Sequence, residues 1–117
     1  MRVLLADDEP KVRAALRLTL EQLKVIDTID EAYDAESMVH QLRAFPPDLL
    51  LVDWELPGLQ RGAWLPDLCQ MPALKVIVLS GRCHVSQFAL ASGADAFVSK
   101  CEPPDRLFDT LRALGAD

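Results

Sequence analysis

Short apolar runs alternate with amphipathic segments along this whole chain, and that alternation strongly limits the folds open to it. Four runs have strand length and almost no polar residue, and a fifth, near 24–33, is weaker and interrupted by acids; the four span 3–6, 49–52, 74–79 and 94–98. Segments with helical spacing follow each run, over 10–23, 35–44, 62–70, 84–92 and 104–114. Near-continuous apolar strands between helices predict a parallel sheet with helices on both faces.

Capping and helix-breaking residues refine these bounds. Pro10 suits the first turn of a helix, with Asp8 as its N-cap. Gly93 suits the end of the helix predicted over 84–92. Pro66 lacks the backbone N–H that an interior helical position donates, so the helix over 62–70 is predicted to be short or kinked.

The chain is long enough for one domain only. It has 117 residues, half of them hydrophobic and 26% charged, which is an ordinary globular composition. The formal charge of −6 and the pI of about 4.8 argue against nucleic acid as a direct partner, because phosphate backbones are bound by basic patches. No apolar run reaches the ~20 residues that span a bilayer, so no membrane segment is expected.

Cysteines and histidines indicate neither a disulfide framework nor a zinc site. Cys69, Cys83 and Cys101 are odd in number and form no CxxC pair, which favours reduced thiols in a cytoplasmic protein. His40 and His84 have no second ligand one helical turn away, so both are interpreted as solvated or packing residues.

Polar side chains follow four of the predicted strands. Asp7 and Asp8 follow the first, Asp53 the third, Ser80 the fourth and Lys100 the fifth. The carboxyl ends of parallel strands meet at one edge, so these groups are expected to converge there. Three clustered carboxylates repel unless a hard cation such as Mg²⁺ neutralises them, and a lysine and a serine can hold phosphate oxygens. The sequence therefore predicts a Mg²⁺-assisted phosphoryl site, without a Gly-rich phosphate loop or GxGxxG.

The order of these residues resembles that of the receiver domain of two-component response regulators. Further matching pieces are Pro57-Gly58 beyond Asp53 and the run Gly93-Ala94-Asp95-Ala96-Phe97 before Lys100. The resemblance covers residues 1–117 as one receiver domain. It implies a three-layer α/β/α, flavodoxin-like fold, with a five-stranded parallel sheet in the order 2-1-3-4-5 and five helices.

The resemblance also implies a role for each site residue. The Asp53 carboxylate would attack the phosphorus of a phosphohistidine on a sensor histidine kinase, giving an acyl phosphate. The implied ligands of Mg²⁺, or of Mn²⁺ in its place, are Asp7, Asp8, Asp53 and the backbone carbonyl of Glu55. Lys100 and Ser80 would contact the phosphoryl group, and Phe97 would change rotamer with Ser80. No enzyme activity is implied beyond self-directed phosphotransfer and autodephosphorylation.

Three positions depart from the usual receiver pattern or flank the site. Cys101 stands where most receivers have a proline after the lysine, which leaves open whether the Lys100–Cys101 peptide is cis. Glu55 and Arg82 are predicted to face each other across the mouth of the site as an ion pair. Such a pair would restrict the attacking water and alter the lifetime of the phosphate.

Two tryptophans, Trp54 and Trp64, can mark contacts beside the site. Trp54 directly follows the predicted phosphoacceptor Asp53, so its fluorescence is expected to report bound metal or phosphate.

The output that this receiver would control is inferred from what is common in the receiver family. The stretch 78–111 looks most like receivers joined to helix-turn-helix DNA-binding domains of the NarL/LuxR type, which implies transcription regulation. Such an output domain would lie outside this chain, and a stand-alone relay is equally open. Receivers commonly dimerise or dock an output domain on the face of the fourth helix, fifth strand and fifth helix; the candidates there are Cys83, Phe88, Phe97 and Leu107.

Two other interpretations remain open from the sequence. A degenerate receiver would serve as a phosphate-independent protein-interaction scaffold. A flavodoxin-like protein would bind FMN on the same fold, although the first turn, Asp7-Asp8-Glu9-Pro10, is acidic rather than a Ser/Thr/Gly phosphate loop.

Overall fold

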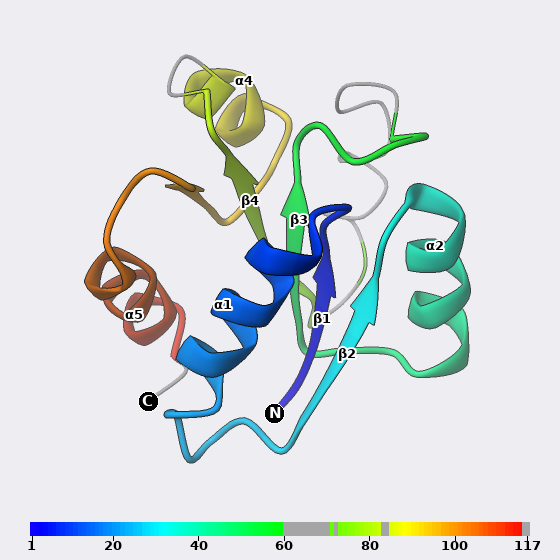
Figure 1. Ribbon diagram of the computed structural model, residues 1–117, viewed down its shortest axis with the longest axis horizontal. Helices are drawn as coiled ribbons and strands as arrows, with labels where there is room; N and C mark the ends of the chain where they lie inside the picture. Colours follow the sequence, from blue (N-terminus) through cyan, green and yellow to red (C-terminus); the bar gives the residue numbers. More distant parts are fainter. Residues whose placement is uncertain (60–70, 72, 83–84, 116–117) are drawn as a thin grey trace.

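A single parallel sheet runs through the middle of the molecule (Figure 1). The computed structural model describes residues 1–59, 71, 73–82 and 85–115. The sheet order is β2-β1-β3-β4-β5, and every neighbouring pair is parallel, as predicted. The strands are β1 (Arg2–Ala6), β2 (Thr28–Ala32), β3 (Leu49–Asp53), β4 (Lys75–Ser80) and β5 (Ala96–Ser99).

Helices cover both faces of this sheet, which confirms the three-layer architecture. The described residues form α1 (Pro10–Leu20), α2 (Ala35–Ala44), α4 (Ser86–Ala91) and α5 (Pro104–Ala113). The helix predicted over 62–70 lies outside the described residues. No helix in the described part of the chain has the length and hydropathy needed to cross a membrane.

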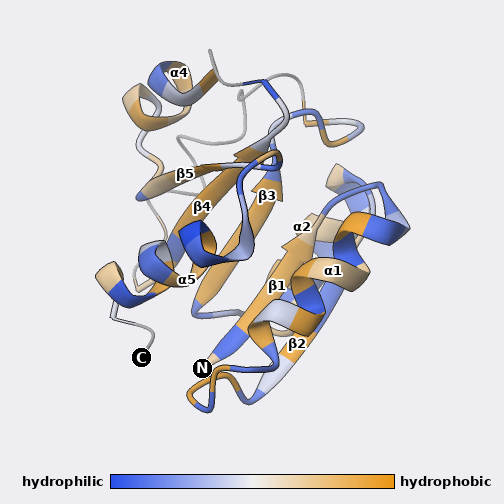
Figure 2. Ribbon diagram, turned by 60° about the vertical axis from the view of Figure 1, so that its left-hand side comes forward, coloured by the Kyte–Doolittle hydropathy of each residue, from blue (hydrophilic) through white to orange (hydrophobic). Residues whose placement is uncertain are grey.

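The apolar strands are explained by burial on two sides. Alternate residues of β3 enter opposite clusters: Leu49 and Leu51 pack with residues of α1 and α5, whereas Leu50 and Val52 pack with residues of α2 and α4. All five β3 residues are buried. In Figure 2, β1, β3 and β4 are accordingly coloured largely hydrophobic, whereas the helices carry both hydrophilic and hydrophobic residues. A strand buried on both faces has no solvent side and hence no polar alternation.

The start of α1 differs from the prediction. Pro10 is the first helical residue, but the N-cap is Glu9 rather than Asp8, and no side chain caps the helix. The Glu9 carbonyl accepts the first hydrogen bond of the helix, from the Arg13 N–H at 3.0 Å. Asp8 is exposed, so its carboxylate is available for another partner.

Two glycines adopt backbone conformations that favour glycine, and Gly93 confirms the predicted helix end. Gly93 follows α4 with φ of 108°, a left-handed conformation that glycine adopts without strain. Gly58 has φ of 85°, and a Cβ there would lie 3.2 Å from the Cβ of Ala35. The neighbouring Pro57 carbonyl accepts the Ala35 N–H at 2.8 Å. This turn therefore joins the loop after β3 to the start of α2.

Candidate functional site

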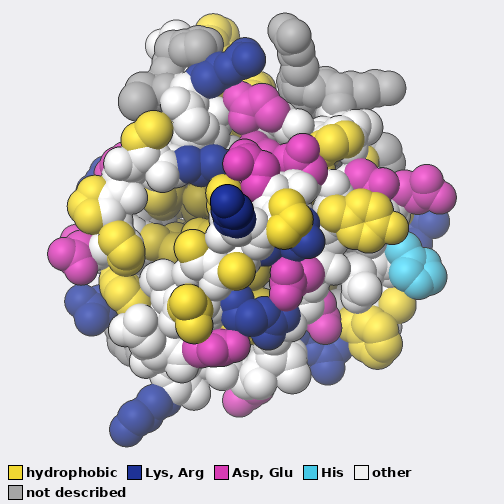
Figure 3. Space-filling model, viewed as in Figure 1, with side chains coloured by type: hydrophobic (Ala, Val, Ile, Leu, Met, Phe, Trp, Pro, Cys, Tyr) yellow, Lys and Arg dark blue, Asp and Glu magenta, His cyan; other side chains and the backbone are white. Residues whose placement is uncertain are grey.

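The carboxyl ends of β1, β3, β4 and β5 meet at one edge of the sheet, as the parallel topology requires. Acidic side chains gather on this edge of the molecular surface, with basic side chains beside them (Figure 3). The structure brings together the acids predicted from β1 and β3 and the lysine predicted from β5, although they are up to 93 residues apart in sequence.

Asp53 is the last residue of β3 and is only 2% exposed. Its Oδ1 accepts the Glu55 N–H at 3.1 Å, and its Oδ2 lies 3.2 Å from Lys100 Nζ. Burial raises the pKa of Asp53 to about 6; the Glu55 N–H and the Lys100 charge oppose this shift, and the nearby Asp7 charge adds to it. The Lys100 charge therefore offsets only part of the cost of burying the Asp53 carboxylate.

Asp7 occupies the matching position after β1 and is 1% exposed. Its Oδ1 accepts the Glu9 N–H at 2.9 Å, while its Oδ2 lies 2.7 Å from Lys100 Nζ without forming a well-directed hydrogen bond. Arg13 Nη1 donates to the Asp7 carbonyl at 2.6 Å and Arg13 Nε donates to Glu31 at 2.9 Å. These contacts hold the acidic turn in place from α1 and β2.

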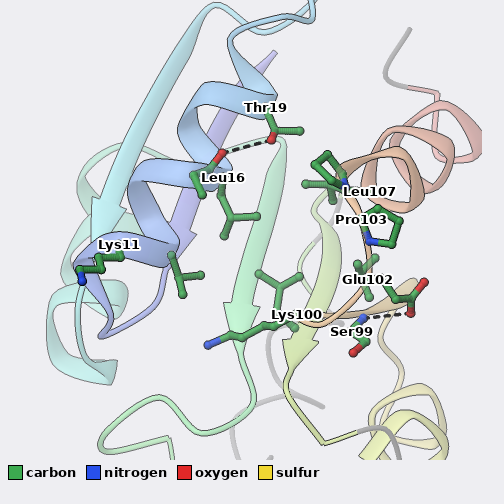
Figure 4. Close-up of a pocket in the computed structure, with 13 residues that line it drawn as sticks. Lys11, Leu16, Thr19, Ser99, Lys100, Glu102, Pro103 and Leu107 are labelled. Carbon is green, nitrogen blue, oxygen red and sulfur yellow. Dashed lines mark hydrogen bonds between the residues drawn. The ribbon is translucent and has the colours of Figure 1, made fainter.

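Lys100 connects the two buried carboxylates. Figure 4 shows its side chain extending from the end of β5 away from α5. Burial on its own lowers the pKa of Lys100, but the close contacts with the Asp7 and Asp53 carboxylates outweigh it and raise the pKa above its usual value. Lys100 therefore stays protonated, and Glu9 Oε1 adds a third acidic contact at 3.4 Å.

The turn after Lys100 is well defined without a proline. All peptide bonds among the described residues are trans, including Lys100–Cys101. Ser99 Oγ accepts the Cys101 N–H at 3.2 Å, and the Ser99 carbonyl accepts the Glu102 N–H at 3.1 Å. The Lys100 N–H donates to the Ser80 carbonyl at 2.9 Å. Backbone hydrogen bonds thus fix the base of the lysine side chain.

A metal ion fits the acidic side of this site. Carboxylate oxygens of Asp7, Asp8, Glu9 and Asp53 all lie within 4.8 Å of one another. Mg²⁺ takes oxygen ligands at about 2.1 Å and retains several waters, so a cluster of this size suits it. The buried Asp7 Oδ2 lies 2.7 Å from the Lys100 ammonium but accepts no well-directed hydrogen bond, so it can also serve as a metal ligand.

Glu9 was not predicted as part of this cluster. Its sequence signal is its place as the third acid in the run Asp7-Asp8-Glu9, directly before the helix. The predicted ligands Asp7, Asp8 and Asp53 are brought together, and the Glu55 carbonyl remains a prediction.

Ser80, Glu55 and Arg82 form a second group beside Asp53. The Ser80 hydroxyl lies 3.0 and 3.2 Å from the two carboxylate oxygens of Glu55, to which it donates. Arg82 Nε lies 3.6 Å from Glu55 Oε1, which confirms the predicted ion pair. The contact of Glu55 with Ser80 was not predicted, because a serine and a glutamate 25 residues apart carry no pairing signal in the sequence.

The other predicted residues are placed as follows. Trp54 and Phe97 are half-buried and pack against the cluster on the α2 and α4 face. Phe88 is 54% exposed on α4, whereas Leu107 is buried between α5 and the sheet. Leu107 is therefore wrong as an interface candidate, since its buried side chain holds α5 to the sheet.

His40 is exposed, as expected. Cys69, Cys83, Trp64 and His84 lie outside the described residues.

An apolar cavity lies next to the site. It has a volume of about 270 Å³ and separates α1 from α5 (Figure 4). Its walls include Val12, Leu16, Val98 and Pro104. The base of Lys100 also contributes to the lining, so the cavity adjoins the charged edge.

Comparison with known proteins identifies the family. The model of the response regulator receiver domain matches residues 3–112. The chain belongs to this family. Similar proteins include the Fimbriae Z protein of Escherichia coli strain K12, 27% identical over 115 residues, covering 96% of this chain and 55% of that protein. Response regulator GtcR of Aneurinibacillus migulanus is 37% identical over 100 residues, covering 84% of this chain and 40% of that protein.

Solved structures agree with this assignment. The isolated receiver domain of RcsB from Salmonella enterica serovar Typhimurium, in the presence of the phosphomimetic BeF₃⁻, has a TM-score of 0.89 at 26% identity, covering 97% of this chain and 87% of that one. The receiver spans about half the length of the relatives matched. Membership of the receiver family sets aside the FMN-binding interpretation.

Proposed function

We propose that this receiver is a phosphorylation-dependent switch with Asp53 as its phosphoacceptor. The observation that carries the proposal is the contact of Lys100 Nζ with both buried carboxylates, at 2.7 Å from Asp7 and 3.2 Å from Asp53. A lysine held at an acidic strand edge provides a fixed positive charge where phosphoryl oxygens would lie. Phosphoryl transfer depends chiefly on such positioning and charge neutralisation.

The proposed reaction uses the phosphohistidine of a sensor histidine kinase. An Asp53 carboxylate oxygen forms a bond to phosphorus, the phosphorus–nitrogen bond breaks, and its electron pair returns to the imidazole of the kinase. The Glu55 N–H at 3.1 Å orients the Asp53 carboxylate, and Lys100 neutralises the transferred oxygens. The Ser80 hydroxyl then donates to the acyl phosphate, and Phe97 follows its movement.

Asp7, Asp8 and Asp53, with the Glu55 carbonyl, are the proposed ligands of Mg²⁺ or Mn²⁺, and Glu9 joins them. The bound cation would supply charge neutralisation for the acids and the phosphoryl oxygens.

The proposed output is control of transcription. Relatives include a nitrate/nitrite response regulator of Escherichia coli strain K12, which is 27% identical over 117 residues. The match covers 54% of the length of that protein. RcsB has been solved bound to promoter DNA. By analogy, phosphorylation of this receiver would change the α4–β5–α5 face, promote a homodimer there, and control a DNA-binding domain outside this chain. A cytoplasmic location follows from that role.

Intact mass spectrometry tests the proposal directly. The chain is incubated with Mg²⁺ and acetyl phosphate, with Asp53→Asn and a Mg²⁺-free sample in parallel. One added phosphoryl group, absent from both controls, is the expected result. No addition from acetyl phosphate or from a phosphorylated histidine kinase would favour the degenerate, phosphate-independent scaffold instead.

A further inference from the structure

The Ser80 hydroxyl is already engaged in the unphosphorylated structure. It is fully buried, it donates to the Glu55 carboxylate at 3.0 Å, and it accepts the Arg82 N–H at 3.0 Å. A hydroxyl has one proton to donate. While that proton is shared with Glu55, it is not available to a phosphoryl oxygen on Asp53.

Glu55 is well placed to hold this proton. Its own N–H donates to Asp53 Oδ1 at 3.1 Å, so its backbone is tied to the phosphoacceptor while its side chain turns to Ser80. Arg82 Nε lies 3.6 Å from the same carboxylate. Hydrogen bonds to an ionised carboxylate are stronger than those to a neutral acceptor, so Glu55 competes effectively for the hydroxyl.

We infer that Glu55, positioned by Arg82, is a latch that holds the switch hydroxyl of Ser80 in the unphosphorylated arrangement. The latch rests on the proposed function, because it needs a phosphoryl group on Asp53 as the competing acceptor. Phosphorylation redirects the Ser80 hydrogen bond from the Glu55 carboxylate to a phosphoryl oxygen, and the proton stays on the Ser80 hydroxyl. The free energy by which Glu55 stabilises the unphosphorylated arrangement of Ser80 must be overcome on phosphorylation. It therefore makes the phosphorylated arrangement less favourable by the same amount.

Equilibrium binding of beryllofluoride in the presence of Mg²⁺ tests the latch, with tryptophan fluorescence as the signal. The variants are Glu55→Gln, Ser80→Ala and the double variant. Glu55→Gln keeps the shape of the side chain and removes its charge. It is expected to bind beryllofluoride roughly fivefold more tightly than the unmodified chain, which corresponds to the difference between a charged and a neutral hydrogen-bond acceptor.

The double variant separates the latch from simple charge repulsion. Removing a negative charge near an anion site tightens anion binding whether or not Ser80 is present, but opening a latch requires the hydroxyl. The gain from Glu55→Gln is therefore expected to fall to about twofold or less in the Ser80→Ala background, as a non-additive cycle. Glu36→Gln removes the same charge from the exposed first turn of α2 and serves as the matched control.

Three results would overturn the latch. One is a Glu55→Gln variant that unfolds at the same urea concentration as the unmodified chain but binds beryllofluoride no more tightly. Another is a gain of equal size with and without the Ser80 hydroxyl. The third is an unmodified chain that binds no beryllofluoride with Mg²⁺, which would remove the proposed function and the latch together; the first two leave the proposed function intact.

Discussion

Asp53 combines burial with a neighbouring acid, and its protonation is coupled to folding. Its pKa is raised from 3.8 to about 6 by burial, so the folded chain binds this proton more tightly than the unfolded chain. Stability then falls as pH rises from about 4 to about 6, because the folded state must release a proton that it prefers to keep. The buried charge destabilises the metal-free protein above that window.

Asp53→Asn is expected to stabilise the metal-free chain at pH 8 by about 1 kcal/mol, since it removes a buried charge and keeps an oxygen for the Glu55 N–H. At pH 4.5 the difference should be clearly smaller, because the carboxyl of the folded chain is then mostly protonated. Urea unfolding at the two pH values, with EDTA present, measures both differences. A variant that is less stable than the unmodified chain at pH 8 would contradict this account.

Under the proposed function, Asp8 acts only as a ligand of the metal ion. It is exposed, it caps no helix, and no hydrogen bond or ion pair of its side chain occurs among the described residues. Saturating Mg²⁺ should raise the free energy of unfolding of the unmodified chain by about 1–3 kcal/mol through binding linkage. Asp8→Asn should lose most of this increase.

The metal-free stability of the same variant is its internal control, because a surface substitution without partners changes stability by about 0.5 kcal/mol or less. Thermal unfolding with Mg²⁺ and with EDTA gives both quantities. An undiminished Mg²⁺ effect in Asp8→Asn would show that Asp8 is not a ligand.

Among the helices, α5 packs on the sheet through a narrow apolar face. Leu111 is fully buried and Leu107 is 4% exposed, while the remaining surface of the helix is largely polar and exposed. This packing keeps α5 against the sheet directly after the turn that positions Lys100.

Leu111→Ala is expected to lower the free energy of unfolding by about 3 kcal/mol, because it leaves a cavity in the cluster shared with β1, β3 and β4. Leu18→Ala, at a position 66% exposed on α1, removes the same atoms from the surface and should change stability by less than about 0.5 kcal/mol. Urea unfolding of the pair gives the comparison. Equal losses would mean that α5 does not pack as described.

At the scale of the whole molecule, α4 presents apolar side chains to solvent beside β5. Phe88 is 54% exposed and Leu90 is 49% exposed. Under the proposed function, beryllofluoride and Mg²⁺ should convert a monomer into a dimer in sedimentation equilibrium. Phe88→Asp should weaken that dimer by roughly tenfold or more, as expected for an aromatic residue in an interface.

Phosphorylation of the Phe88→Asp variant by acetyl phosphate should stay within about twofold of the unmodified chain, because Phe88 is outside the Asp53 site. A chain that remains monomeric with beryllofluoride bound would contradict a homodimer on this face.

The order of elements, the parallel sheet and the edge at which the site lies could all be predicted from the amino-acid sequence. These features follow from local patterns: apolar runs such as 49–52 identify buried strands, and the residue after each strand must lie at the same edge of a parallel sheet. Asp7, Asp53 and Lys100 could be predicted for this reason alone.

Most of the contacts between side chains at that edge could not be predicted and depend on the folded chain. The tertiary structure placed the α1 cap at Glu9, brought Glu9 into the acidic cluster, and directed the Ser80 hydroxyl to Glu55 rather than toward Asp53. Each choice depends on rotamers and on competition among charges from segments far apart in the chain. Hydrophobic periodicity carries no information about such polar partners, because it reports burial and not direction.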